Sequence, residues 1–264
     1  MRYLSTRGGD PASAAEAIVR GISPSGGLYV PESYPTIDWK NGVRGGYLAT
    51  AHLVMQAYLP ETDSAELSRM ITAAYKSFDH AEVTPLVKLK GREHVLELWH
   101  GPTMAFKDVA LQMLPHLMRS SLRQTGETKQ VYILVATSGD TGKAALEGFR
   151  DVDGTRVLVF YPYGGVSEAQ RLQMVTQEGN NVDVCAVHGN FDDAQTGVKQ
   201  IFASREIAQK LDEKDWRLSS ANSINFGRLL PQIVYYFTSY QSLVASGEIQ
   251  PGEKVNFCVP TGNF

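Results

Sequence analysis

The sequence predicts an α/β protein with open, mostly parallel sheets that carry helices on both faces, preceded by a helical N-terminal layer. Two observations support this fold class. Apolar, β-rich runs occupy residues 131–136, 156–162, 182–189 and 254–260, a composition typical of parallel strands covered on both faces. Helical stretches fill the gaps between these runs, and such alternation of strands and helices favours parallel pairing.

The N-terminal layer, residues 1–80, is expected to form a domain of its own. A helix over 10–21 would begin with Asp10 as its N-cap and Pro11 in its first turn. A second helix is expected over 47–59. The stretch between these helices is rich in glycine and proline, which indicates loops.

Residues 81–264 are expected to form the α/β region that carries the site. About 120–210 would make a smaller βαβ domain, and about 81–119 with 211–264 would belong to a larger, incomplete one. Helices are predicted over 142–150, 167–179, 192–211 and 228–247, the second and fourth ending at glycine. Ligands of open parallel sheets bind at the carboxyl ends of the strands, so we expect functional residues in the loops that follow them.

The C-terminal end of the sequence follows directly on the apolar run at 254–260. A glycine loop begins there with Gly262, Asn263 and Phe264, where a further helix should follow. Because domains rarely end on a buried strand, we expect the sequence to be truncated at its C-terminus, with the missing part completing the larger sheet.

Composition and charge limit the classes of binding partner that the sequence favours. The net charge is −3, so no basic surface indicates nucleic acid, and no apolar run is long enough to span a bilayer. The start of the chain lacks the apolar segment of a secretory signal, which favours the cytoplasm. We expect a small-molecule substrate and a monomer or homodimer.

A metal site and a disulfide are not expected. On a strand, His94 and His100 would share one face while Glu97 pointed to the other, so the three could not bind one ion. Cys185 and Cys258 fall in apolar strand-like runs, where a buried thiol acts as a small hydrophobic group.

The loop after the run at 131–136 has the composition of an anion cradle. Glycines let backbone N–H groups face a concavity, and the N-terminus of the following helix adds positive partial charge, so a carboxylate or phosphate would fit. A plain capped turn is the alternative. Asp140 would then cap the helix, or it would hydrogen-bond to a cofactor hydroxyl. The loop comprises Thr137, Ser138, Gly139, Asp140, Thr141 and Gly142.

Lys107 stands out because its neighbours suggest burial. It follows a Gly-Pro-Thr break, lies beside Phe106 and precedes an apolar helical run. Thr103 could cap that helix, which would put the amine near the positive helix end. Burial and the helix dipole both disfavour the ammonium form, and a neutral amine is what an aldehyde needs to form a Schiff base. A solvent-exposed lysine is the alternative.

Five motifs resemble the threonine synthase family, in the same order along the chain: "GISPSGGLYVP", "HGPTMAFKDVA", "ATSGDTGKAA", "SANSINFGRLLPQIVYYF" and "VPTGNF". The resemblance spans nearly all 264 residues. It implies the fold called fold type II, shared with tryptophan synthase β and cysteine synthase, and pyridoxal 5'-phosphate as the cofactor, held by Lys107 as a Schiff base.

The resemblance also assigns roles to residues of this sequence. The implied cofactor-binding residues are Lys107, Phe106, Asp140, Gly262, Asn263 and Phe264, the last three beginning the loop that binds the cofactor phosphate. The implied substrate-binding residues are Thr137, Ser138, Gly139, Thr141, Gly142, Asn222, Ser223, Asn225 and Arg228. Lys107 is the implied catalytic residue.

The implied activity is that of a lyase of threonine biosynthesis, which converts O-phospho-L-homoserine and water to L-threonine and phosphate. Two alternatives stay open: another fold type II lyase, such as a serine/threonine dehydratase, and a non-catalytic ligand-binding relative that uses Lys107 only as a charge. Because the glycine-rich phosphate loop is incomplete in these 264 residues, we expect them alone to bind the cofactor poorly and to be inactive.

Overall fold

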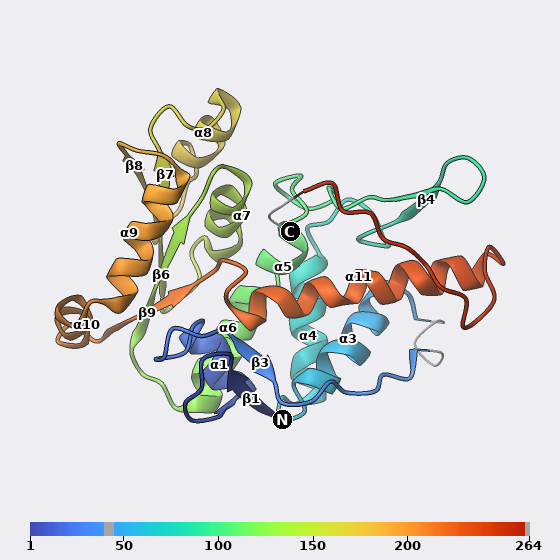
Figure 1. Ribbon diagram of the computed structural model, residues 1–264, viewed down its shortest axis with the longest axis horizontal. Helices are drawn as coiled ribbons and strands as arrows, with labels where there is room; N and C mark the ends of the chain where they lie inside the picture. The colour runs from blue at the N-terminus through green and yellow to red at the C-terminus, as the bar shows by residue number, and fades with distance from the viewer. Residues whose placement is uncertain (40–44, 262–264) are drawn as a thin grey trace.

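The computed structural model describes residues 1–39 and 45–261 (Figure 1). Its N-terminal part is not purely helical, because β1 (Arg2–Ser5) pairs antiparallel with β2 (Ala12–Ser13) and β3 (Tyr29–Pro31). The predicted Asp10 cap is wrong. Residues 12 and 13 are extended, so α1 (Ala14–Arg20) begins after Ser13, whose Oγ accepts the Glu16 N–H at 3.2 Å in a capping box.

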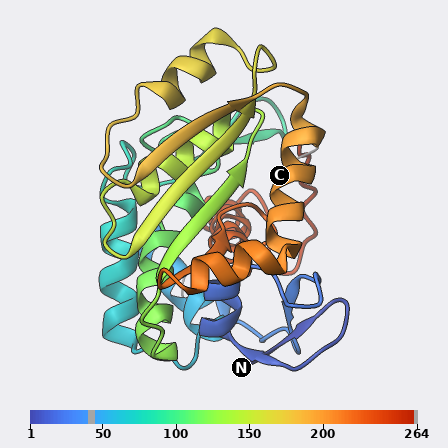
Figure 2. The same cartoon turned by 90° about the vertical axis from the view of Figure 1, so that its left-hand side faces the viewer.

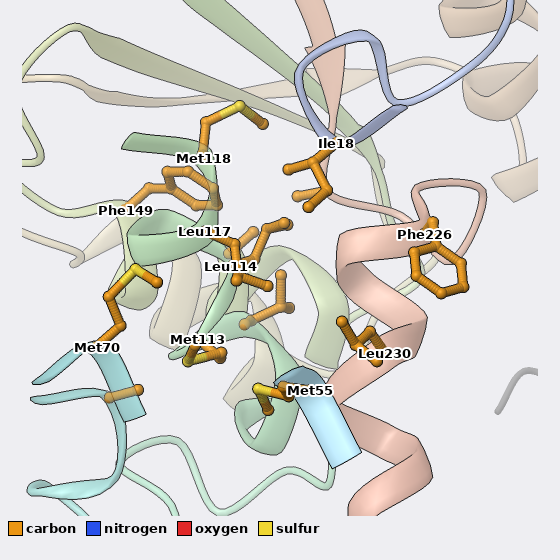
Figure 3. Close-up of a cluster of buried hydrophobic side chains, with 14 of the residues drawn as sticks. Ile18, Met55, Met70, Met113, Leu114, Leu117, Met118, Phe149, Phe226 and Leu230 are labelled. Carbon is orange, nitrogen blue, oxygen red and sulfur yellow. The ribbon is translucent and has the colours of Figure 1, made fainter. Parts of the chain in front are cut away.

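A group of helices contributes side chains to the main hydrophobic core. It contains α3 (Gly46–Tyr58), which confirms the helix expected over 47–59, together with α4 (Ser64–Tyr75), α6 (Leu114–Thr125) and α11 (Phe226–Ala245). Figure 3 shows side chains of these helices and of α1 pointing into one cluster, which is buried and apolar. This core joins residues on both sides of position 80, and the proposed domain boundary there stays a prediction.

The parallel sheet has the strand order β8-β7-β6-β9. Three of its strands confirm the predicted runs: β6 (Gln130–Ala136), β7 (Thr155–Pro162) and β8 (Val182–Val187). The fourth, β9 (Trp216–Ser220), was not predicted, because an arginine and two serines interrupt its apolar pattern.

The strand predicted over 254–260 is wrong. These residues form no strand, they pair with no other strand in the described part of the chain, and nearly all of them are exposed. An apolar, β-rich composition does not make a strand when no neighbouring strand offers a hydrogen-bonded ladder. Cys258 is therefore exposed rather than buried, and Cys185 is only half-buried because β8 is the edge strand of the sheet.

Helices cover both faces of this sheet (Figure 2). One face packs on α7 (Asp140–Phe149), against which α8 (Glu168–Val175) lies, and the other packs on α9 (Phe191–Ala203). The side chains of strand β6 point alternately to the two faces of the sheet. Ile133 and the residues two positions before and after it join the main core, while Leu134 joins a second apolar cluster with side chains of α9.

Two helix predictions need correction. The single helix expected over 192–211 is two helices, α9 and α10 (Arg205–Asp212), because Ser204 is extended and its Oγ caps α10 at the Ile207 N–H, 3.3 Å away. The helix expected to run to Gly179 ends at Val175.

Shorter elements complete the fold. An antiparallel pair, β4 (Leu86–Lys88) and β5 (His94–Leu96), precedes the one-turn helix α5 (Asp108–Leu111). Among the described helices, none is both long and apolar enough to cross a membrane.

Candidate active site

The sheet has a topological switch point between β6 and β9. The chain builds outward from β6 through β7 to β8 on one side, and β9 lies on the other side of β6. The loops that follow β6 and β9 therefore leave the same sheet edge next to each other. Asn222, in the second loop, donates from Nδ2 to the Ala136 carbonyl at 3.3 Å. A crevice between such loops is where open α/β sheets bind ligands.

The first loop is shaped by Thr137. Its Oγ1 accepts the N–H groups of Gly139 and Gly142, each at 3.0 Å, so these two donors are used inside the loop. Gly139 has φ 150°, a conformation that favours glycine. Helix α7 begins at Asp140, directly after this turn.

The open donors of the loop are the N–H groups of Ser138, Asp140 and Thr141, which have no partner among the described residues. They lie at the N-terminus of a ten-residue helix, where the helix dipole favours negative charge. The predicted capping role of Asp140 is wrong, because its side chain makes no cap bond and instead accepts Gln170 Nε2 at 3.0 Å.

Lys107 is buried, with 8% of its surface exposed. Its Nζ lies 3.9 Å from the centroid of the Phe106 ring. The prediction that Thr103 caps the following helix is wrong. Its N–H and Oγ1 both donate to the carboxylate of Asp108, each at 2.7 Å. The turn is thus folded back onto the residue that follows the lysine.

The pKa of the Lys107 amine is lowered to about 8, mainly by burial and then by the positive charge of Arg228, and the carboxylate of Asp140 opposes both. Asp140 opens α7 and Arg228 lies in the first turn of α11, so the charges that act on the amine come from both sides of the switch point. With such a pKa roughly one amine in ten is neutral at pH 7, against roughly one in 2,500 for an unperturbed lysine.

Arg228 is the second buried cation, with 3% of its surface exposed. Burial lowers the pKa of its guanidinium to about 10, so it stays charged at neutral pH. Its Nη1 donates to Gln232 Oε1, whereas its Nε is buried without a hydrogen-bond partner in the part of the chain that the structure describes. Two adjacent buried cations and an open donor favour the binding of an anion.

The side chain of Asn225 makes its hydrogen bonds within the fold. It is fully buried, its Nδ2 donates to the carbonyls of Ile18 (3.0 Å) and Ser220 (2.9 Å), and its Oδ1 accepts the Gly227 N–H at 2.9 Å as the cap of α11. Its amide hydrogens are therefore both used. Asn222 and Ser223, earlier in the same loop, are half-buried.

Two further sets of residues from the sequence analysis have separate outcomes. Gly262, Asn263 and Phe264 lie outside the described residues. The strand geometry assumed for the histidines is wrong: β5 ends at Leu96, and His100 Nε2 lies 2.8 Å from Glu97 Oε2 while its Nδ1 lies 2.6 Å from Asp79 Oδ1. Within residues 1–39 and 45–261, no group of three histidine, cysteine or acidic residues could hold a metal ion.

Comparisons with known proteins match the whole chain. Residues 2–75 fit the family model "Threonine synthase N terminus". Threonine synthase from Pseudomonas aeruginosa is 43% identical over 100% of this chain and 55% of its own length, and threonine synthase from Schizosaccharomyces pombe is 41% identical over 100% of the chain and 52% of its own length. The chain belongs to the threonine synthase family. It spans about half the length of these curated relatives.

Solved structures of threonine synthases agree with the fold. A pyridoxal-phosphate-bound threonine synthase from Brucella melitensis matches with a TM-score of 0.86 and 42% identity, covering 100% of this chain and 55% of that one. Yeast threonine synthase matches with a TM-score of 0.81 and 37% identity, covering 92% of this chain and 50% of that one. The expected fold type II architecture is thereby confirmed.

Three residues beside this crevice were missed by the sequence analysis: Asp108, Gln170 and Gln232. Asp108 could have been noticed as a carboxylate that follows Lys107 in an apolar context, which requires buried hydrogen bonds. Gln232 lies four residues after Arg228, the helical spacing for a side-chain pair. No sequence signal links Gln170 to Asp140, because they lie in different helices.

Proposed function

We propose that this chain carries the lysine-bearing part of the active site of a pyridoxal-phosphate-dependent threonine synthase, a lyase that converts O-phospho-L-homoserine and water to L-threonine and phosphate. The observation that carries the proposal is the buried Lys107 amine, whose pKa is about 8. The names of the relatives support the reaction, and the cofactor in the Brucella melitensis structure supports the cofactor.

The residues present fit this cofactor. An aldehyde needs a neutral amine, and Lys107 supplies one in a dry setting beside the Phe106 ring. We therefore propose Lys107 as the Schiff-base lysine, with Phe106 and Asp140 as further cofactor contacts. The role of Gly262, Asn263 and Phe264 in holding the cofactor phosphate stays a prediction.

Bound pyridoxal phosphate would supply an electron sink for negative charge that develops on the substrate carbons. Lys107 Nζ then acts as the base that takes the proton from substrate Cα, and a pKa near 8 suits a base that works close to neutral pH. The Phe106 ring beside Nζ excludes water from this amine.

The substrate carboxylate is assigned to the open N–H groups at the start of α7, in the loop formed by Thr137, Ser138, Gly139, Thr141 and Gly142. Arg228 is assigned to the phosphate, because a guanidinium stabilises the charge that builds on a leaving phosphate. Asn222 and Ser223, in the loop after β9, are proposed as further substrate contacts. Asn225 is not carried into this set, because its side chain is bonded within the fold.

The alternatives concern the chemistry at the same lysine. A dehydratase would eliminate a group from Cβ and would not need an anion site for a γ-phosphate. A non-catalytic relative would retain the cradle without reaction. Threonine synthase-like 1 from Homo sapiens is 39% identical to this chain over 95% of it, so sequence identity alone does not separate threonine synthases from proteins named only as like them. Placement in the cytoplasm and the monomer or homodimer state remain predictions.

Phosphate release by the natural full-length protein tests the proposal. With O-phospho-L-homoserine we expect phosphate and threonine in equal amounts, and with O-phospho-L-serine neither. Pyridoxal phosphate should give a yellow absorbance that borohydride fixes and Lys107→Ala removes, while the matched variant Lys76→Ala, at an exposed helix end, retains it. Absence of the absorbance in the unaltered protein would favour the non-catalytic relative, and pyruvate from O-phospho-L-serine would favour the dehydratase.

A further inference from the structure

Arg228, Gln232 and Tyr235 form a hydrogen-bonded row on one face of α11. Their spacing of four and three residues places the side chains above one another along the helix. Arg228 Nη1 donates to Gln232 Oε1, and Gln232 Nε2 donates to the Tyr235 hydroxyl at 3.0 Å. All three side chains are buried, with Gln232 only 6% exposed.

The partner of Arg228 is a neutral amide, although a buried arginine more often pairs with a carboxylate. Arg228 forms no ion pair with a residue in the described part of the chain. An amide oxygen fixes the orientation of the guanidinium without cancelling its charge. The charge therefore remains available to an incoming anion and to the neighbouring amine of Lys107.

The Tyr235 hydroxyl holds the Gln232 amide in the orientation that Arg228 requires. Arginine has only donors, so the amide must present its oxygen to Arg228 and its NH₂ group elsewhere. The Tyr235 hydroxyl receives that NH₂ group. Burial raises the pKa of Tyr235, so the group stays a neutral hydroxyl throughout the working pH range.

We propose that Gln232 is a positioning residue of this site: its oxygen, oriented through the Tyr235 hydroxyl, holds the guanidinium of Arg228 ready for the phosphate group of the ligand. The proposal rests on the anion-binding role of Arg228 in the proposed function. Gln232 itself touches no reacting atom. Its loss should act on two properties through Arg228, namely the affinity for a phosphate ion and the protonation of Lys107.

The test uses the cofactor-free, natural full-length protein and inorganic phosphate as the probe. Gln232→Met removes the acceptor with little change in shape, Gln232→Glu keeps the acceptor and adds a negative charge, and Tyr235→Phe removes only the hydroxyl. The matched control is Gln241→Met. Gln241 is an equally buried glutamine of the same helix, bonded to the Thr50 hydroxyl and to a distant carbonyl and not to Arg228.

Two measurements are made on each variant: the phosphate dissociation constant by calorimetry, and the pH midpoint of Lys107 acetylation by mass spectrometry. Gln232→Met should weaken phosphate binding about tenfold, the loss of one charge-assisted hydrogen bond, and should raise the Lys107 midpoint because the guanidinium no longer stays in place. Gln232→Glu should raise that midpoint further. Tyr235→Phe should weaken phosphate binding about threefold.

If Gln232 had only a structural role, Gln232→Met and Gln241→Met would lower the unfolding free energy by similar amounts. Neither variant would then change the phosphate dissociation constant or the pH midpoint of Lys107 acetylation. That result would overturn the proposal, as would a Gln232→Glu variant indistinguishable from the unaltered protein. Failure of the proposed function looks different: the protein would release no phosphate from O-phospho-L-homoserine, while the Gln232 variants would still shift phosphate affinity and the Lys107 midpoint, so the positioning role would stand.

Discussion

Gly101 is the position where a single methyl group should disturb the lysine turn most. A Cβ added at Gly101 would lie 2.4 Å from Asp108 Cβ and 2.6 Å from Asp108 Oδ2. Carbon atoms in contact are about 3.5 to 4.0 Å apart, so the Asp108 side chain must move by about 1 Å. The two hydrogen bonds that Thr103 donates to this carboxylate, at 2.7 Å each, cannot both survive that movement.

The cost of Gly101→Ala combines two effects. Losing one hydrogen bond to a buried, charged group costs about 1.5 to 3 kcal/mol. Overpacking a site that is already filled costs about 1 to 3 kcal/mol. We therefore expect the free energy of unfolding to fall by about 3 kcal/mol or more. The pH midpoint of Lys107 acetylation should change as well, because the turn that holds the lysine shifts.

Urea unfolding of two glycine variants provides the assay. Gly197→Ala is the matched control, because this glycine lies inside α9 and a Cβ there would meet nothing within 4 Å. Replacing a helical glycine by alanine in open space should stabilise the protein by about 0.5 to 1 kcal/mol. If Gly101→Ala lowered the unfolding free energy by less than about 1 kcal/mol, Asp108 would not be the anchor of the turn.

Three further variants test separate contacts. Thr137→Val should lower the unfolding free energy by about 1 to 3 kcal/mol, because the Gly139 N–H loses its acceptor while the Gly142 N–H keeps only the Gly139 carbonyl. Thr137→Ser should restore the stability, and equal stability of the Val and Ser variants would contradict this. Hydrogen bonds that the His100 ring donates to Glu97 and to Asp79 raise its pKa above the usual 6.5. Its contribution to stability is therefore complete below pH 6.5 and is lost as pH rises through the folded-state pKa. His100→Gln should remove that pH dependence from urea unfolding curves. Asn225→Ala should lower the unfolding free energy by about 2 to 4 kcal/mol while the KM for O-phospho-L-homoserine in the natural full-length protein stays the same; a raised KM with unchanged stability would return Asn225 to the substrate site.

The sequence was most informative where composition and position coincide. The run at 131–136 is apolar and β-branched, so it had to be a buried strand, and the glycine loop after it had to lie at the sheet edge. Lys107 could be singled out because apolar neighbours and a Gly-Pro break surround a charged group. The structure adds that Asp108, not Thr103, organises this turn, which depends on a contact across five residues that no local pattern encodes.

The errors have physical causes. Strand β9 was missed because its polar residues hide the apolar pattern, and its partner β6 lies 80 or more residues earlier in the chain. The run at 254–260 was taken for a strand because composition cannot reveal whether a pairing partner exists. Asn225 was assigned to the substrate by the family resemblance. The structure adds that its side chain is bonded to two carbonyls packed around it, which no sequence pattern encodes.

The central claim is that Lys107 holds a dry, easily neutralised amine between the two loops of the switch point. The most direct measurement is the rate of acetylation of Lys107 as a function of pH, followed by mass spectrometry of the peptide that contains it. The structure predicts a half-maximal rate near pH 8, because burial lowers the pKa of the amine to about that value. A midpoint near the ordinary lysine value of about 10.4 would show that the amine is solvated, and the account of the site would be wrong.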